Sequence, residues 1–115
     1  MNCNIIKSNN SSIIDIGCEM LSCNHLSMST KIRNFREFFG SNRAAVKCWV
    51  CMTQHYKEST LSKHKMLFVL YYLKRNPTNG EAANFLKCHS QTYIFWRDTY
   101  LTYICNLPVV RNVNV

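Results

Sequence analysis

The sequence predicts an all-α fold of four to five short helices, ending in a helix-turn-helix and preceded by a disordered N-terminal leader. Three observations predict it. Apolar residues recur at spacings of three and four through most of residues 31–106, as on one face of a helix. Ser, Gly and Pro residues stand where these segments begin and end. From Gly80 to Tyr103 the chain has a short helical segment, a tight turn and a longer aromatic-rich segment.

Residues 1–30 are expected to be a flexible leader, because they are rich in Asn and Ser and show no sustained apolar period. No apolar signal segment opens the chain. We therefore expect a nuclear or cytoplasmic protein, not a secreted one, with reduced cysteines. The longest apolar run, Met66–Leu73, is far shorter than the roughly 20 residues of a membrane helix, so no membrane partner is expected.

The first three helices are expected at Lys31–Phe39, Arg43–Tyr56 and Lys63–Arg75. Gly40 suits the C-cap of the first, and Ser41 suits the N-cap of the second. The residues expected on the inner faces of these helices are Ile32, Phe35, Phe38 and Phe39; Ala45, Cys48, Trp49, Met52 and Tyr56; and Met66, Val69, Leu70 and Leu73.

Pro77 breaks the chain before a fourth helix over about Gly80–Lys87, in which Ala82, Ala83 and Leu86 should face inward. A turn over residues 87–89 should lead into a fifth helix that begins near Ser90, its expected N-cap, and runs to about Cys105. Pro108 should end the domain at about residue 106, leaving residues 107–115 as a frayed tail. The expected inner stripe of the fifth helix is Tyr93, Trp96 and Tyr100.

The formal net charge of +8 is uneven, with −1 on residues 1–30 and +9 on residues 31–115. A basic fold attracts polyanions, and duplex DNA is the leading candidate. The six acidic residues are scattered and only three glycines are present, so neither a paired-carboxylate site nor a phosphate-binding loop is visible. We therefore predict that the chain is not an enzyme and needs no cofactor.

The start of the fifth helix is the expected DNA-reading element. There Gln91 suits adenine and Thr92 suits a phosphate, while Arg97 and nearby cations would neutralise the backbone. The predicted nucleic-acid-binding residues are Lys74, Arg75, Lys87, His89, Ser90, Gln91, Thr92 and Arg97.

A metal site is the weaker interpretation of Cys48, Cys51 and His55, which fall on neighbouring positions of one helical face. A structural zinc site normally pairs two such knuckles, and the sequence has no second one. We therefore predict no metal ligands and keep a small zinc-stabilised domain as an alternative.

The order of four motifs resembles the region ahead of the catalytic domain in Harbinger-type DDE transposases and proteins derived from them. The motifs lie at Phe35–Ser41, His64–Lys74, Leu86–Trp96 and Leu107–Val110, and the similarity covers about residues 32–111. The resemblance implies recognition of transposon-end-like duplex DNA. It carries no catalysis over, because the catalytic acids of that family lie downstream of this region.

Within the motif at Leu86–Trp96, four residues depart from the family pattern. Lys87 replaces the turn glycine, and a left-handed conformation there would cost Lys about 1 kcal/mol. His89 stands where Ser is usual, and Ile94 and Phe95 stand where basic residues are frequent. The apolar pair supports a rival interpretation, a helical module that binds a protein partner in place of DNA. Exposure of these two side chains would favour the rival.

Overall fold

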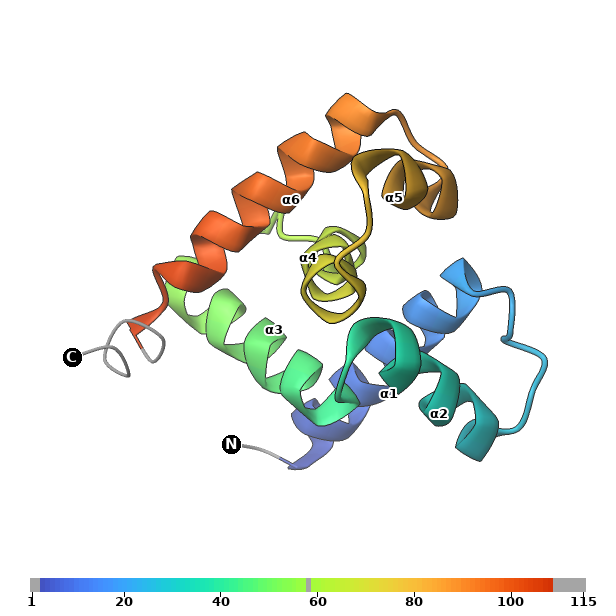
Figure 1. The fold of residues 1–115 in the computed structure, drawn as a ribbon. Coiled ribbons are helices and arrows are strands. Elements are labelled where there is room, and N and C mark those ends of the chain that lie inside the picture. Colours follow the sequence, from blue (N-terminus) through green and yellow to red (C-terminus); the bar gives the residue numbers. More distant parts are fainter. Residues whose placement is uncertain (1–2, 58, 109–115) are drawn as a thin grey trace.

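The computed structural model describes residues 3–57 and 59–108 and is helical throughout its regular elements, which confirms the all-α prediction. Figure 1 shows the helices gathered around α4. Within the described residues the helices are α1 (Cys3–Met20), α2 (Met28–Phe39), α3 (Asn42–Tyr56), α4 (Lys63–Arg75), α5 (Asn79–Leu86) and α6 (Ser90–Cys105).

The central helix α4 is covered on most sides, because α1, α2, α3 and α6 all pack against it. A helix with such neighbours needs apolar side chains around most of its circumference. In α4 these buried residues are Met66, Leu67, Phe68, Val69 and Tyr71. Leu73 was expected to face inward with them, but it lies in the last turn and is 59% exposed. That prediction is wrong, because the Leu73 side chain faces solvent while Tyr72 and Arg75 beside it make the contacts with α6 and α2.

The remaining inner-face predictions are close to the observed burial. Phe35, Ala45 and Met52 are buried, and Ala82, Ala83 and Leu86 of α5 are buried as expected. The Ser41 and Ser62 side chains accept hydrogen bonds from the N–H groups of Ala44 and Lys65, so both cap the helices that follow them. Local polar signals therefore define where these helices begin.

The N-terminal segment differs from the flexible leader expected over residues 1–30. Cys3–Met20 is the helix α1, and Ile13, Ile14 and Cys18 are fully buried. The first half is rich in Asn and Ser, which have low helix propensity, so the sequence did not predict a helix here. Packing of the Ile-rich second half on α2, α3 and α4 supplies the stability that propensity lacks.

Polar contacts also fix α1 to its three neighbours. Lys63 Nζ donates to Ser12 Oγ at 3.0 Å, linking α4 to α1. Lys31 Nζ lies 3.2 Å from Asp15 Oδ1, linking α2 to α1. A hydrogen bond between two asparagine side chains links α3 to α1. Together these contacts place α1 within the folded body of the molecule.

The C-terminal end of α6 meets the C-terminal end of α3 (Figure 1), where the Tyr56 hydroxyl donates to the carbonyl of Tyr103. Leu107 was expected to open a frayed tail, but its side chain is buried at this junction. The prediction for residue 107 is therefore wrong, because the residue completes the core between these helix ends. Residues 109–115 of the expected tail lie outside the described part of the chain.

Candidate nucleic-acid interface

A tight turn of three residues joins α5 to α6. Lys87 adopts the left-handed conformation, with φ 56° and ψ 48°, and ends α5. The Cys88 N–H then donates to the Ala83 carbonyl at 3.0 Å, which closes the C-terminal turn of α5. Lys87 therefore carries the conformational cost that a residue other than glycine incurs at such a position.

We expect Lys87→Gly to raise the free energy of unfolding by about 1 kcal/mol, because glycine adopts this conformation without the Cβ clash that Lys meets. The Lys87 side chain is exposed, so its removal sacrifices no buried contact. Urea unfolding followed by circular dichroism measures the change. Lys87→Ala is the control, since alanine keeps the Cβ and should give no such gain. An equal gain in both variants would contradict the explanation.

Helix α6 begins at Ser90 as predicted, but its N-cap lies one residue earlier than expected. His89 is the N-cap, and its side chain makes no capping hydrogen bond, while Ser90 is the first helical residue and not the expected cap. Side chains cap the other described helix starts, at α2 to α5, where Ser27, Ser41, Ser62 and Thr78 accept hydrogen bonds. The first N–H groups of α6 are thus left for another acceptor.

Most of the predicted reading residues surround this start of α6 and face solvent. The exposed residues are Lys87, His89, Ser90, Gln91 and Thr92. A shallow pocket of about 390 Å³ lies beside them, lined by Ala83, Asn84, Lys87, Cys88 and His89. Sequence reasoning missed Asn84, although its position three residues before Lys87 places both on one side of α5. An accessible helix N-terminus with polar and cationic neighbours is suited to a phosphate oxygen.

Arg97 differs from its predicted role as a free phosphate-binding cation. Its Nε donates to Asp98 Oδ1 at 2.9 Å, and its Nη1 donates to Asn79 Oδ1 at 3.1 Å. The guanidinium lies 5.0 Å from the ring centre of Tyr72 and 5.3 Å from that of Tyr93. Only 18% of the side chain is exposed, and the hydrogen bond to Asp98 raises its pKa further. Arg97 therefore joins α6 to α4 and to the start of α5.

The other two predicted cations lie at the C-terminal end of α4. Arg75 Nη1 is 3.8 Å from Glu37 Oε1, and its guanidinium lies 4.5 Å from the ring centre of Phe38. Lys74 is exposed. The eight-residue helix α5 separates this pair along the chain from the turn at Lys87. The predicted site residues thus come from two helix ends, the end of α4 and the start of α6.

The outward face of α6 is nearly free of positive charge. The exposed positions along it include Gln91, Phe95, Asp98 and Thr102, and Arg97 is neutralised by its neighbour Asp98. Phe95 is 58% exposed and packs edge-on against Trp96, whereas Ile94 is half-buried. Of the two apolar residues that depart from the family pattern, Phe95 is therefore the one exposed at the surface.

The inner aromatic stripe of α6 is structural. Tyr93 and Tyr100 are buried, and the ring of Tyr93 lies against Phe68 of α4. Lys65 Nζ stands 3.5 Å from the ring centre of Trp96, a close cation–π contact that adds to the junction of α4 with α6. These contacts fix the orientation of α6 relative to α4.

Cys48, Cys51 and His55 do not form a metal centre in the structure. Across residues 3–57 and 59–108, no three His, Cys, Asp or Glu side chains converge closely enough to hold a metal ion. The Cys48 thiol lies 4.0 Å from the sulfur of Met52. Burial, with a smaller contribution from Cys51, raises the pKa of Cys48 to about 11, whereas zinc binds the thiolate.

Comparison with models of protein families, with curated proteins and with solved structures found no match. The resemblance to Harbinger-type transposases thus rests on the order and spacing of motifs in the sequence. Among the described helices, none is both long enough and apolar enough to span a membrane.

Proposed function

We propose that the chain binds duplex DNA through the turn at Lys87 and the first turn of α6, without catalytic activity of its own. The supporting observation is the exposed, uncapped start of α6 held in a three-helix frame by α4 and α5. Gln91 and Thr92 are exposed in this first turn, and in the proposed complex they would contact base edges and phosphates in the major groove. The motif order agrees with a domain that recognises transposon ends, ahead of a nuclease domain.

The charge distribution sets the expected strength of this binding. Lys87 and Lys74 are the exposed lysines of the predicted site, while Arg75 and Arg97 face carboxylates. Each phosphate contact contributes about −0.9 to the slope of log affinity against log salt. We therefore expect a slope of about −2, which corresponds to weak binding that is lost at high salt.

The test is a fluorescence-anisotropy titration of labelled duplex DNA at two salt concentrations. Lys87→Gln should reduce the slope by about 1, because it removes one phosphate contact. Lys57→Gln is the matched control, since Lys57 is also an exposed lysine in the left-handed conformation but ends α3. Salt-independent binding, no binding at low salt, or equal effects of both variants would refute the proposal.

The second candidate is a helical module that binds a protein partner, which the exposure of Phe95 favours. A single substitution separates the candidates. If α6 lies against DNA, Phe95→Arg adds a cation to that face and should tighten binding and steepen the salt slope by about 1. If neither Phe95→Arg nor Phe95→Ala changes the affinity or the salt slope, the outward face of α6 does not contact DNA. The protein-binding interpretation is then preferred.

A further inference from the structure

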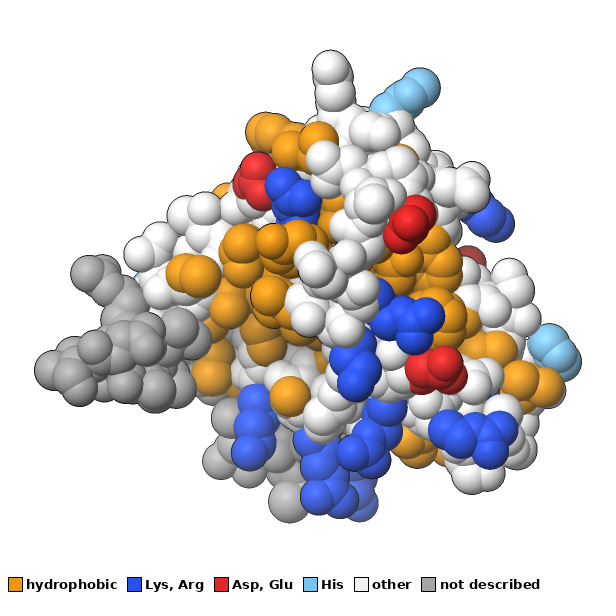
Figure 2. Space-filling model, in the orientation of Figure 1, with side chains coloured by type: hydrophobic (Ala, Val, Ile, Leu, Met, Phe, Trp, Pro, Cys, Tyr) orange, Lys and Arg blue, Asp and Glu red, His pale blue; other side chains and the backbone are white. Residues whose placement is uncertain are grey.

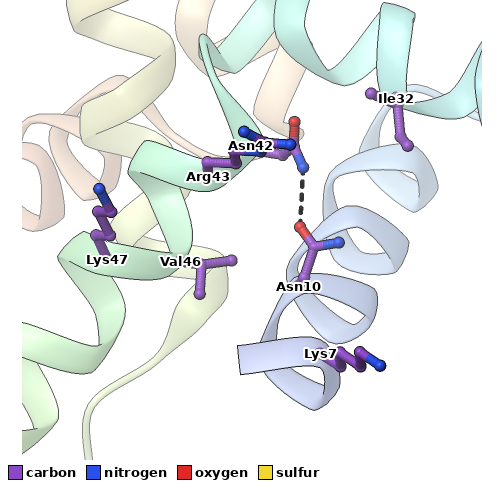
Figure 3. A pocket seen from close by; sticks show the side chains of 7 residues that line it. All are labelled: Lys7, Asn10, Ile32, Asn42, Arg43, Val46 and Lys47. Atoms are coloured by element: carbon purple, nitrogen blue, oxygen red, sulfur yellow. Dashed lines mark hydrogen bonds between the residues drawn. The ribbon is translucent and has the colours of Figure 1, made fainter. Parts of the chain in front are cut away.

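A cleft of about 580 Å³ opens between α1 and the beginning of α3 (Figure 3). Its volume falls in the range of pockets that bind small organic ligands. Figure 1 shows that α3 and α6 converge at their C-terminal ends, so their N-terminal ends lie at opposite ends of the molecule. The cleft is therefore distinct from the start of α6.

The polar lining of the cleft carries positive charge alone. Lys7, Arg43 and Lys47 line it, and no carboxylate belongs to the described lining residues. All three cations are exposed, and the ion pairs found among described residues involve other cations, namely Lys31, Arg75 and Arg97. Figure 2 shows Lys and Arg side chains gathered along the lower edge of the molecule, where α3 begins. Three unneutralised cations around one cavity favour a ligand with more than one negative charge.

The two walls of the cleft are held together by a pair of amides. Asn42 Nδ2 donates to Asn10 Oδ1 at 2.9 Å, joining the first residue of α3 to the middle of α1 (Figure 3). The start of α3 adds the positive potential of a helix N-terminus to that of Arg43 beside it. The cationic lining is thus attached to a fixed junction of two helices.

Part of the lining is apolar. Val46 is buried on α3, and Ile32 of α2 is half-buried at the other side of the cleft. Small-molecule sites combine such surfaces with a few polar groups that fix the orientation of the ligand. An inorganic anion would leave the apolar lining unused, whereas a nucleotide carries both a phosphate for the cations and a planar base for the apolar surface.

We propose that the cleft between α1 and α3 binds a nucleotide that carries a terminal phosphate. Arg43 is the principal phosphate ligand, because its planar guanidinium can donate two parallel hydrogen bonds to phosphate oxygens. Lys7 on α1 and Lys47 on α3 belong to opposite walls, and their side chains point away from the space between the walls (Figure 3), so they supply further positive charge at the rim of the cleft. This site is independent of duplex binding by α6. The nucleotide is either free or the 5′-phosphorylated end of a strand, since both present the same chemistry.

The probe is adenosine monophosphate, titrated calorimetrically into the full chain without DNA. We expect Arg43→Gln/Lys47→Gln to weaken binding at least about tenfold, because each lost charged hydrogen bond is substantial. Arg36→Gln/Lys57→Gln changes the net charge equally at two exposed cations outside the cleft lining and should leave the affinity unchanged. An equal loss in this control would mean that net charge attracts the phosphate without the cleft, and it would overturn the proposal.

Adenosine, and one oligonucleotide with and without a 5′-phosphate, complete the experiment. Adenosine should bind at least about tenfold more weakly than its monophosphate, and equal binding would overturn the proposal. If the phosphorylated strand binds through Arg43 and Lys47 while the free nucleotide does not, the strand end is the ligand and the proposal stands. Failure of both probes overturns it. Duplex binding by α6 is measured separately, so each proposal can fail alone.

Discussion

Ile13→Ala is expected to lower the free energy of unfolding by about 2–5 kcal/mol, the usual cost of emptying a buried Ile position. Ile13 is fully buried and belongs to the main hydrophobic core together with Phe35 and Met66. Its loss removes contacts that hold α1 against the rest of the fold. Urea unfolding of the full chain, followed by circular dichroism, gives the change directly.

Ser11→Ala provides the control on the same helix, since Ser11 is exposed and its replacement should alter stability by no more than about 0.5 kcal/mol. The comparison distinguishes a docked helix from a flexible leader. A leader would make both substitutions equally harmless, and that result would contradict the packing of α1 described above.

Gly17→Ala should also destabilise the protein, although alanine is the better helix former. A Cβ at residue 17 would stand 2.5 Å and 2.6 Å from two ring carbons of Phe35, and 3.1 Å from a ring carbon of Phe39. Phe35 is fully buried, so its ring cannot swing into solvent. Such overpacking typically costs about 1–3 kcal/mol, and the gain in helix propensity returns at most about 1 kcal/mol. We expect a net loss of up to about 2 kcal/mol.

Gly80→Ala is the matched control, because Gly80 also lies within a helix but a Cβ there meets no atom within 4 Å. The same substitution should stabilise the protein by about 0.5–1 kcal/mol at this site. Opposite signs for Gly17→Ala and Gly80→Ala would show that close packing of α1 on α2 decides the first result. A stabilising effect at both positions would mean that α1 and α2 do not approach so closely.

The arrangement of charge has a consequence for the proposed DNA binding. The start of α6 offers hydrogen-bonding groups and one lysine, whereas the three unpaired cations of the cleft lie at the beginning of α3 and on α1. The net charge of the chain therefore overstates the positive electrostatic potential at the start of α6. Long-range attraction would still concentrate DNA near the molecule, but specific affinity must come from Gln91, Thr92 and the adjacent backbone.

The sequence by itself determined five of the described helices. The bounds of α4 and α6 agree with the prediction, and Ser41 and Lys87 adopt the capping and turn roles expected of them. These features are local, because a cap or a turn depends on a few neighbouring residues. The burial of Ala82, Ala83 and Leu86 followed from the same local periodicity.

The candidate site was predictable only in part. Sequence reasoning found the exposed group from Lys87 to Thr92, since these residues follow a recognisable turn. It missed the cleft, because Lys7 and Arg43 are 36 positions apart and become neighbours only when α1 packs on α3. No local pattern marks two cations that meet across a helix interface.

The tertiary structure alone decided the state of α1 and the role of Arg97. The first half of α1 is poor in helix-forming residues, and it was the burial of Ile13 and Ile14 against other helices that made the segment part of the fold. From the sequence Arg97 was expected to be a free surface cation. In the fold, Asn79 of α5 and Tyr72 of α4 contact its guanidinium. Local preference sets where helices start and stop, whereas long-range packing decides which of their side chains remain free to bind.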